Sequence, residues 1–277
     1  MFRRLPSAIV RALLVVLLVL TPAALLPGVR EDGAPFLMIA AMSAAVFTMI
    51  EYTVRSPSLV EFRDAPPFNR LRFFTLFSIV AAVTLSIRGL ERATPVTDWV
   101  LKVANWSVAT LDGNFSPFRL MFALTPAEAT PDETLVFHSA VALSYLIAVA
   151  ALLISVTWMY IRRWPRRGGP FDVWLNLPTF DPARGGDVVR RLKRDSWFNL
   201  VLGIFMPFLI PVLLAAVPPV SRLLSFEEPS SLVWAIAAWV FLPFSLVMRG
   251  TALARVAQMI QLHRRRKGLP EVVQPAR

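Results

Sequence analysis

Six long apolar runs, nearly free of charge inside, alternate with short polar segments along the chain. Each run is long enough to cross about 30 Å of hydrocarbon as a helix, which takes roughly 17 to 25 residues. The pattern therefore predicts an all-α fold, a polytopic membrane protein built as a six-transmembrane-helix bundle with short interfacial amphipathic helices. The predicted spans within this single membrane domain (residues 1–277) are Ser7–Leu26, Pro35–Val54, Leu71–Arg88, Thr134–Tyr160, Ser196–Val217 and Leu232–Met248.

The first run has a second interpretation. A basic start, a short apolar stretch and small residues near Ala24 are also typical of a cleaved signal peptide. The apolar run continues to Leu26, so we expect a retained span. Cleavage would leave the orientation of the other five spans unchanged.

Positive charge is distributed unevenly between the two sides of the predicted bundle. With the N-terminus inside, 23 of the 29 lysines and arginines lie on the cytoplasmic side and 6 on the other. This asymmetry follows the positive-inside rule and predicts that both termini are cytoplasmic. Arginine makes up 26 of the 29, a bias typical of a GC-rich bacterial genome, so we expect a bacterial inner (plasma) membrane. The net charge of +11 is then a topology signal, and because no base-stacking or groove-reading motif accompanies it, nucleic acid is not an expected partner.

The outer loop, residues 89–133, is predicted to contain an amphipathic helix. Trp99, Val103 and Trp106 recur at helical spacing, so this helix should lie flat on the outer leaflet. The stretch Phe115–Leu124 is too short to cross and is expected to form a second interfacial or re-entrant piece.

Two predicted cytoplasmic segments are basic and partly aromatic. The loop 161–195 is too short for an independent catalytic domain, and it should contain a short basic helix starting at Asp181 or Asp187. The tail 249–277 should extend the last span as a helix. We expect both to dock on anionic lipid headgroups, on a membrane-protein partner or on a second copy of the chain. The candidate docking residues are Trp164, Phe171, Trp174, Phe180, Arg190, Arg191, Arg264, Arg265 and Arg266.

The search for chemistry predicts no catalytic residue, no cofactor and no metal. The chain has no cysteine and two histidines, and the motifs of nucleotide-binding loops, zinc proteases and serine hydrolases are missing. His138 is expected to be a boundary residue with a hydrogen-bonded neighbour, although a single axial haem ligand is the alternative. Glu51 should pair with Arg55 one turn later. No ionisable residue is predicted deep in the bilayer, which argues against a proton relay.

Prolines interrupt the last two spans. Pro207, Pro211 and Pro243 each remove the hydrogen bond to the carbonyl four residues earlier, which frees those of Gly203, Pro207 and Trp239. The bilayer supplies no water, so these carbonyls should face protein, a polar side chain or a wet cavity. The kinks either shape packing alone or open a mid-membrane pocket of the kind found in transporters. The candidate pocket residues are Asn199, Gly203, Pro207, Pro211, Trp239 and Pro243.

Three function classes remain. The favoured one is a non-catalytic membrane protein acting as an accessory subunit or as an assembly or scaffold factor of a membrane complex. The alternative is a transporter or channel for a small molecule or lipid, using the kinked fifth and sixth spans. The third is an enzyme acting on lipids at the interface, for which Asp172, Asp181 and Asp187 are the candidate cluster.

Overall fold

The computed structural model describes residues 5–26, 34–111, 116–126, 128–162, 164–165, 173–180, 187–217 and 224–267. Throughout these ranges the regular structure is helical, with no strand. Six helices are long and apolar enough to cross a membrane, which confirms the predicted fold class. They are α1 (Leu5–Leu25), α2 (Ala34–Thr53), α3 (Phe68–Glu91), α6 (Pro131–Ile161), α8 (Val188–Ala216) and α10 (Pro229–Arg266).

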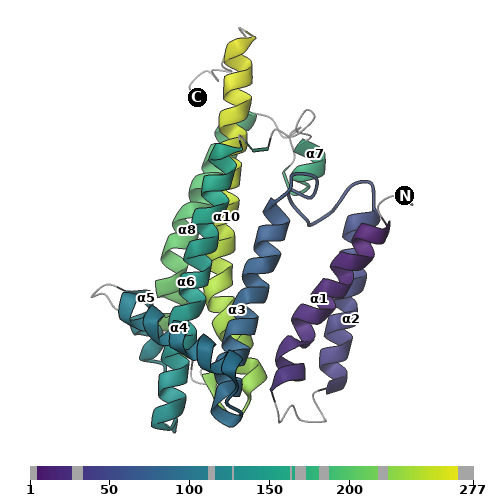
Figure 1. Cartoon of the computed structure of the whole chain (residues 1–277). Helices are drawn as coiled ribbons and strands as arrows, with labels where there is room; N and C mark the ends of the chain where they lie inside the picture. Colours follow the sequence, from purple (N-terminus) through teal and green to yellow (C-terminus); the bar gives the residue numbers. More distant parts are fainter. Residues whose placement is uncertain are drawn as a thin grey trace.

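The six helices form a main bundle and a lateral hairpin. Helices α3, α6, α8 and α10 make up the bundle, and the α1–α2 hairpin lies beside it (Figure 1). Helix α1 begins and α10 ends at the same end of the molecule, which we name the basic end because Arg72, Arg249 and Arg264 lie towards it. The other end, where α1 ends and α10 begins, is the opposite end.

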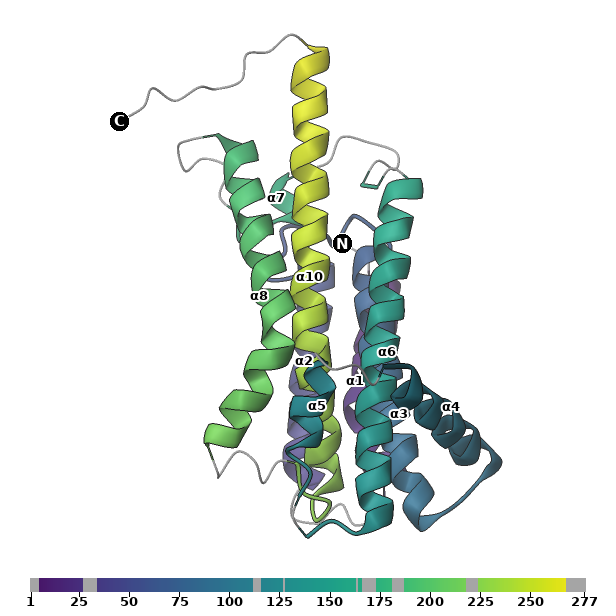
Figure 2. The ribbon, with the colours of Figure 1, turned by 90° about the vertical axis from the view of Figure 1, so that its left-hand side faces the viewer.

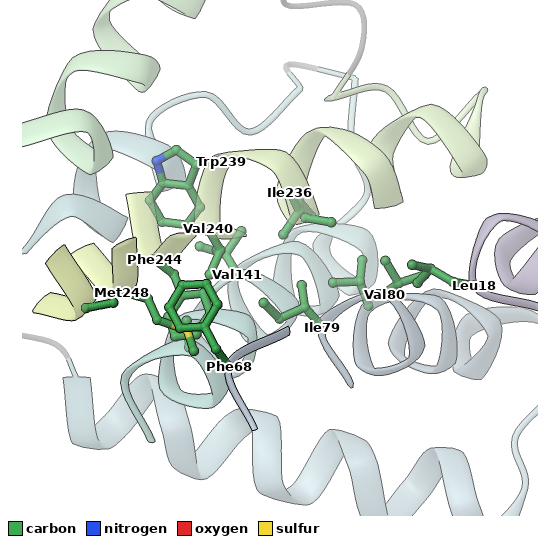
Figure 3. Close-up of a cluster of buried hydrophobic side chains, with 14 of the residues drawn as sticks. Leu18, Phe68, Ile79, Val80, Val141, Ile236, Trp239, Val240, Phe244 and Met248 are labelled. Carbon is green, nitrogen blue, oxygen red and sulfur yellow. The ribbon is translucent and has the colours of Figure 1, made fainter. Parts of the chain in front are cut away.

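Helix α10 is the centre of the bundle. It packs most extensively on α8 and also contacts α6, α3 and α1. Its buried residues include Ile236, Val240 and Phe244, which meet Val80 of α3 and Val141 of α6 in the core (Figure 3). Each other spanning helix therefore contributes one face to a core organised around α10, apart from α2, which packs on α1.

Capping residues set where two of the spans begin. The Thr130 side chain and that of Glu133 form a reciprocal capping box at the start of α6, with Pro131 in the first turn. Asp187 caps α8 through the amides of Val189 and Arg190. Because this cap lies before the basic segment, that segment is the first part of α8 and not a separate helix. The predicted continuation of the last span is confirmed, since α10 extends to Arg266.

The segment between α3 and α6 contains α4 (Pro95–Leu111) and the short α5 (Pro117–Phe122). Helix α4 is amphipathic as predicted, but Val103 lies with the residues packed on the bundle and not with the two exposed tryptophans. Trp99 and Trp106 are 65% and 59% exposed, whereas Val100 and Ala104 pack against α3 and α6. Helix α5 lies against α6 and α8 (Figure 2), with Phe118 and Met121 buried. A single turn, α7 (Val173–Asn176), lies near the basic end.

Candidate functional site

The seam between α8 and α10 is the most extensive helix–helix interface in the described part of the chain, and the two backbones approach closely at two glycines. A Cβ added at Gly203 would lie 2.7 Å from Val247 Cγ2 and 2.9 Å from the Pro243 carbonyl oxygen. One added at Gly250 would lie 2.9 Å from the Ser196 carbonyl oxygen, and Ser196 Oγ donates to the Gly250 carbonyl at 2.8 Å. Glycine is needed at both positions because the facing backbone occupies the space of a side chain.

The Pro207 carbonyl, which lacks the usual hydrogen-bond donor within its own helix, accepts a hydrogen bond across this seam. Pro211 lacks the amide that would bond the Pro207 carbonyl, and Trp239 Nε1 of α10 donates to that oxygen at 3.0 Å. Trp239 is 1% exposed, so the bond is shielded from water and lipid. The prediction that this carbonyl faces protein is confirmed, and the bond ties the proline-containing part of α8 to α10.

The six candidate pocket residues all lie on this seam. Asn199, Gly203, Pro207 and Pro211 are on the buried face of α8, and Trp239 and Pro243 are buried on α10. The structure therefore brings together the residues that the sequence grouped. Their surroundings are close contacts between the helices, and whether a pocket opens among them stays a prediction.

A polar network at the basic end was missed by the sequence reasoning. Arg249 of α10 donates two hydrogen bonds to the Glu61 carboxylate, from Nε to Oε2 at 2.6 Å and from Nη2 to Oε1 at 2.8 Å. Thr179 Oγ1 donates to Glu61 Oε1 at 2.9 Å, and Arg249 Nη1 donates to Asn199 Oδ1 at 3.1 Å. The network joins α8, α10 and the two connections that hold Glu61 and Thr179. Residue Asn199 belongs both to this network and to the predicted pocket.

Two further arginines surround this network. Arg72 of α3 donates to Ser245 Oγ of α10, and its Nε is buried without a hydrogen-bond partner. Arg63, whose side chain is 2% exposed, donates to the backbone carbonyls of Glu51, Val54 and Arg55. Both guanidiniums are thereby held inside the folded chain, at the level where α3 and α10 approach the basic end.

Glu51 does not have the partner expected from helical spacing. Helix α2 ends at Thr53, so Arg55 is no longer on the same helical face. The chain turns instead, and the Glu51 carboxylate accepts the amides of Ser58, Leu59 and Val60 at 3.0–3.1 Å. This carboxylate closes the turn that leads into the polar network.

The chemistry that this arrangement supports is structural. A proton-carrying carboxylate must be free to bind and release a proton, whereas Glu61 is 9% exposed and engaged by a bidentate arginine and a threonine. Searched over the described residues alone, no group of three or more histidines, aspartates and glutamates could hold a metal ion. His138 Nε2 lies 3.0 Å from Thr125 Oγ1, and the imidazole ring stacks on that of Phe122. His138 is therefore hydrogen-bonded to a neighbour, as expected.

Several candidate docking residues have partners within the chain. Trp164 is 4% exposed and donates to the Ala65 carbonyl at 3.1 Å, and its ring packs beside the contacting rings of Phe62 and Phe68. Phe180 is buried, with the Arg191 guanidinium 4.5 Å from its ring centroid. Phe171 and the side chain of Trp174 lie outside the described residues. The docking role of the set stays a prediction, and Trp164 and Phe180 contribute to the fold itself.

The basic tail is also tied down in part. Arg264 Nη1 donates to Asp187 Oδ1 at 2.5 Å, which links the end of α10 to the start of α8. Burial acts to raise the pKa of Asp187, but the bonds from Arg264 and from the amides of Val189 and Arg190 outweigh it and lower the pKa. Three other candidate docking residues are exposed: Arg190, Arg265 and Arg266. Of the candidate aspartate cluster, Asp172 and Asp181 lie outside the described residues.

Comparison of the chain with known protein families, with curated proteins and with solved structures finds no match.

Proposed function

We propose that this chain is a non-catalytic, multi-pass protein of a bacterial inner membrane, acting as an accessory subunit or as an assembly or scaffold factor of a membrane complex. Both termini would be cytoplasmic, as the distribution of arginine indicates. Its basic end would contact anionic lipid headgroups, and its partner would be another membrane protein or a second copy of the chain.

The observation that carries this proposal is the mutual bonding of the polar groups on and beside the α8–α10 seam. Arg249 donates to both Glu61 and Asn199. Trp239 donates to the Pro207 carbonyl, a freed backbone group of the kind that a kinked transporter helix presents to its substrate. A transporter site needs polar groups directed at a cargo. Here they are directed at each other, which supports a scaffold over transport.

The surface of α2 supports docking to a helical partner. This helix packs on α1 alone among the described helices, and its outer face combines small residues, Ala40 and Ser43, with exposed Phe36 and Phe47. Small residues let another helix approach closely, and in a bilayer close packing is a main source of helix association. The face is therefore suited to a transmembrane helix of a partner.

The test is a native pull-down from membranes through a C-terminal tag, with lipid-preserving extraction and mass spectrometry of what co-purifies. We expect a partner in stoichiometric amount, lost in Ala40→Trp and kept in Ala150→Trp, a matched change on the exposed side of α6. Recovery of the wild-type chain as a lone monomer would contradict the proposal. Transport by the Pro207–Pro211–Pro243 region would then be the hypothesis to test.

A further inference from the structure

A groove lies between the α1–α2 hairpin and α10, towards the opposite end. Its volume is about 390 Å³, and it is walled by Val19 and Pro22 of α1, Leu37 of α2, and Trp234 and Ala238 of α10. Small side chains on α10, Ala235 and Ala238, leave this space where larger residues would have filled it. The volume falls in the range of small-molecule sites, about 300 to 1,000 Å³.

The position of the groove determines what can occupy it. Its walls belong to three helices long and apolar enough to span the membrane, and they are almost wholly apolar. Water is a poor occupant because such walls offer it few hydrogen-bond partners. The groove is partly open and is walled by membrane-spanning helices, so we expect the hydrocarbon of one leaflet to meet it. An acyl chain matches both its shape and its chemistry.

The rim of the groove at the opposite end is acidic. Glu227 and Glu228 are exposed and are separated by Pro229 from Ser230 and Ser231, which line the groove. Ser231 Oγ donates to Glu228 Oε2 at 3.2 Å. In the sequence, the two connections that lead into α2 and α10 each carry two acids and one arginine. A headgroup with a positive charge complements this rim, whereas a purely anionic headgroup is repelled.

We propose that this groove binds a phospholipid with an amine in its headgroup, with one acyl chain against Trp234 and Ala238 and the amine beside Glu227 and Glu228. The site is separate from the α8–α10 seam and from the α2 face. It therefore goes beyond the proposed function and does not depend on it.

The test uses phosphatidylethanolamine with a photoactivatable diazirine on one acyl chain, incorporated with the full-length protein into nanodiscs. After irradiation, peptide mass spectrometry locates the adducts. We expect adducts concentrated on the groove-lining parts of α1 and α10. They should fall roughly tenfold in Ala238→Phe, the change that about 1.4 kcal/mol produces. Ala150→Phe, on an exposed alanine of α6, is the matched control and should leave them unchanged.

Two comparisons make the outcomes decisive. Diazirine-labelled phosphatidylglycerol should label the groove less, and the double change Glu227→Gln with Glu228→Gln should remove that difference; equal labelling by both lipids overturns the headgroup assignment. Competition by excess unlabelled phosphatidylethanolamine tests the wild-type protein without any variant. Adducts spread evenly over the exposed faces of α2 and α8, with no competition, overturn the site itself.

Discussion

The α8–α10 pair and the α1–α2 hairpin are both antiparallel pairs of apolar helices, yet they are held together in different ways. Across the α8–α10 seam run the bonds from Trp239 to Pro207 and from Ser196 to Gly250. In the hairpin, the hydroxyls of Thr21 and Thr48 bond back to carbonyls of their own helix. Apolar burial gives little driving force inside a bilayer, so cross-helix bonds and close backbone contact make the first pair the rigid one.

The difference assigns separate roles to the two regions. The seam and its polar network fix the shape of the main bundle. The hairpin leaves most of α2 uncovered, with Ala41 and Glu51 as the buried residues among those described. The hairpin is held by apolar contacts and by the Arg11 guanidinium of α1, 4.5 Å from the centroid of the Tyr52 ring of α2. A region without cross-helix hydrogen bonds of the kind seen on the seam can accept a lipid or another helix at small cost. Four substitutions test this contrast, in order of expected effect.

Glu61→Gln should cause the largest loss of stability. It leaves Arg249 without its bidentate partner, and removing one member of a buried pair costs about 3 to 5 kcal/mol. The Arg249 side chain is 32% exposed, so we expect a cost towards or below the lower end of this range. The measurement is the free energy of unfolding in mixed micelles titrated with sodium dodecyl sulfate. Glu91→Gln, at an exposed site, is the control and should change little.

Gly203→Ala should push α8 and α10 apart. Its new methyl group meets the Pro243 backbone oxygen at 2.9 Å, and overpacking of this kind costs about 1 to 3 kcal/mol. Gly89→Ala on α3 is the matched control. There the nearest atom is the tip of the Leu101 side chain at 3.2 Å, which can rotate away. An equal loss of thermal stability in both variants would contradict the special closeness of the seam.

Trp239→Phe should have a moderate effect. Phenylalanine keeps one aromatic ring at this site, but the Pro207 carbonyl loses its donor, and hydrogen bonds between membrane helices contribute about 0.6 kcal/mol on average. We expect a loss of at least this size in the same unfolding assay, because the missing five-membered ring also leaves a small cavity. Trp99→Phe, on the exposed face of α4, should have none, and a comparable loss there would show that the indole bond is not responsible.

Asp187→Asn should have the smallest effect, about 1 kcal/mol or less, since asparagine caps a helix as well as aspartate and only the ion pair with Arg264 is lost. The pKa of Asp187 is lowered in the fold. Its contribution is therefore fully present above the unfolded value, near 3.8, and disappears as the pH falls through the lower folded value. Unfolding measured between pH 3 and 6 should show this loss in the wild type and not in the variant.

The fold was predictable because its signals are local. Length and polarity identified six spans, and Asp187 was identified as a possible helix start. The same local reasoning predicted that the Pro207 carbonyl needs a donor. It could not predict that the donor is Trp239, because this depends on the register of two helices that are separated in the sequence.

The polar network could not be predicted in the same way. Glu61 and Arg249 are 188 positions apart, and in the sequence Arg249 is only one of the 23 basic residues predicted on the cytoplasmic side. One signal was present in the sequence: an acid in a basic loop and an arginine at the end of a span, both at the same predicted membrane boundary. Glu51 shows the opposite error, since spacing predicted an Arg55 partner that the end of α2 at Thr53 removes.

The length of α10 determines which cations can touch the membrane. At about 1.5 Å per residue, its 38 residues extend about 57 Å, against about 30 Å of hydrocarbon. With the helix upright and Arg249 at the hydrocarbon edge, Arg264 stands about 22 Å beyond it. Salt screens charges over about 8 Å at physiological ionic strength, so the tip of α10 is electrically remote from the lipids. The cations that contact headgroups are then those nearer the hydrocarbon edge, such as exposed Arg70 and Arg162. The tip of α10 faces molecules in the aqueous phase.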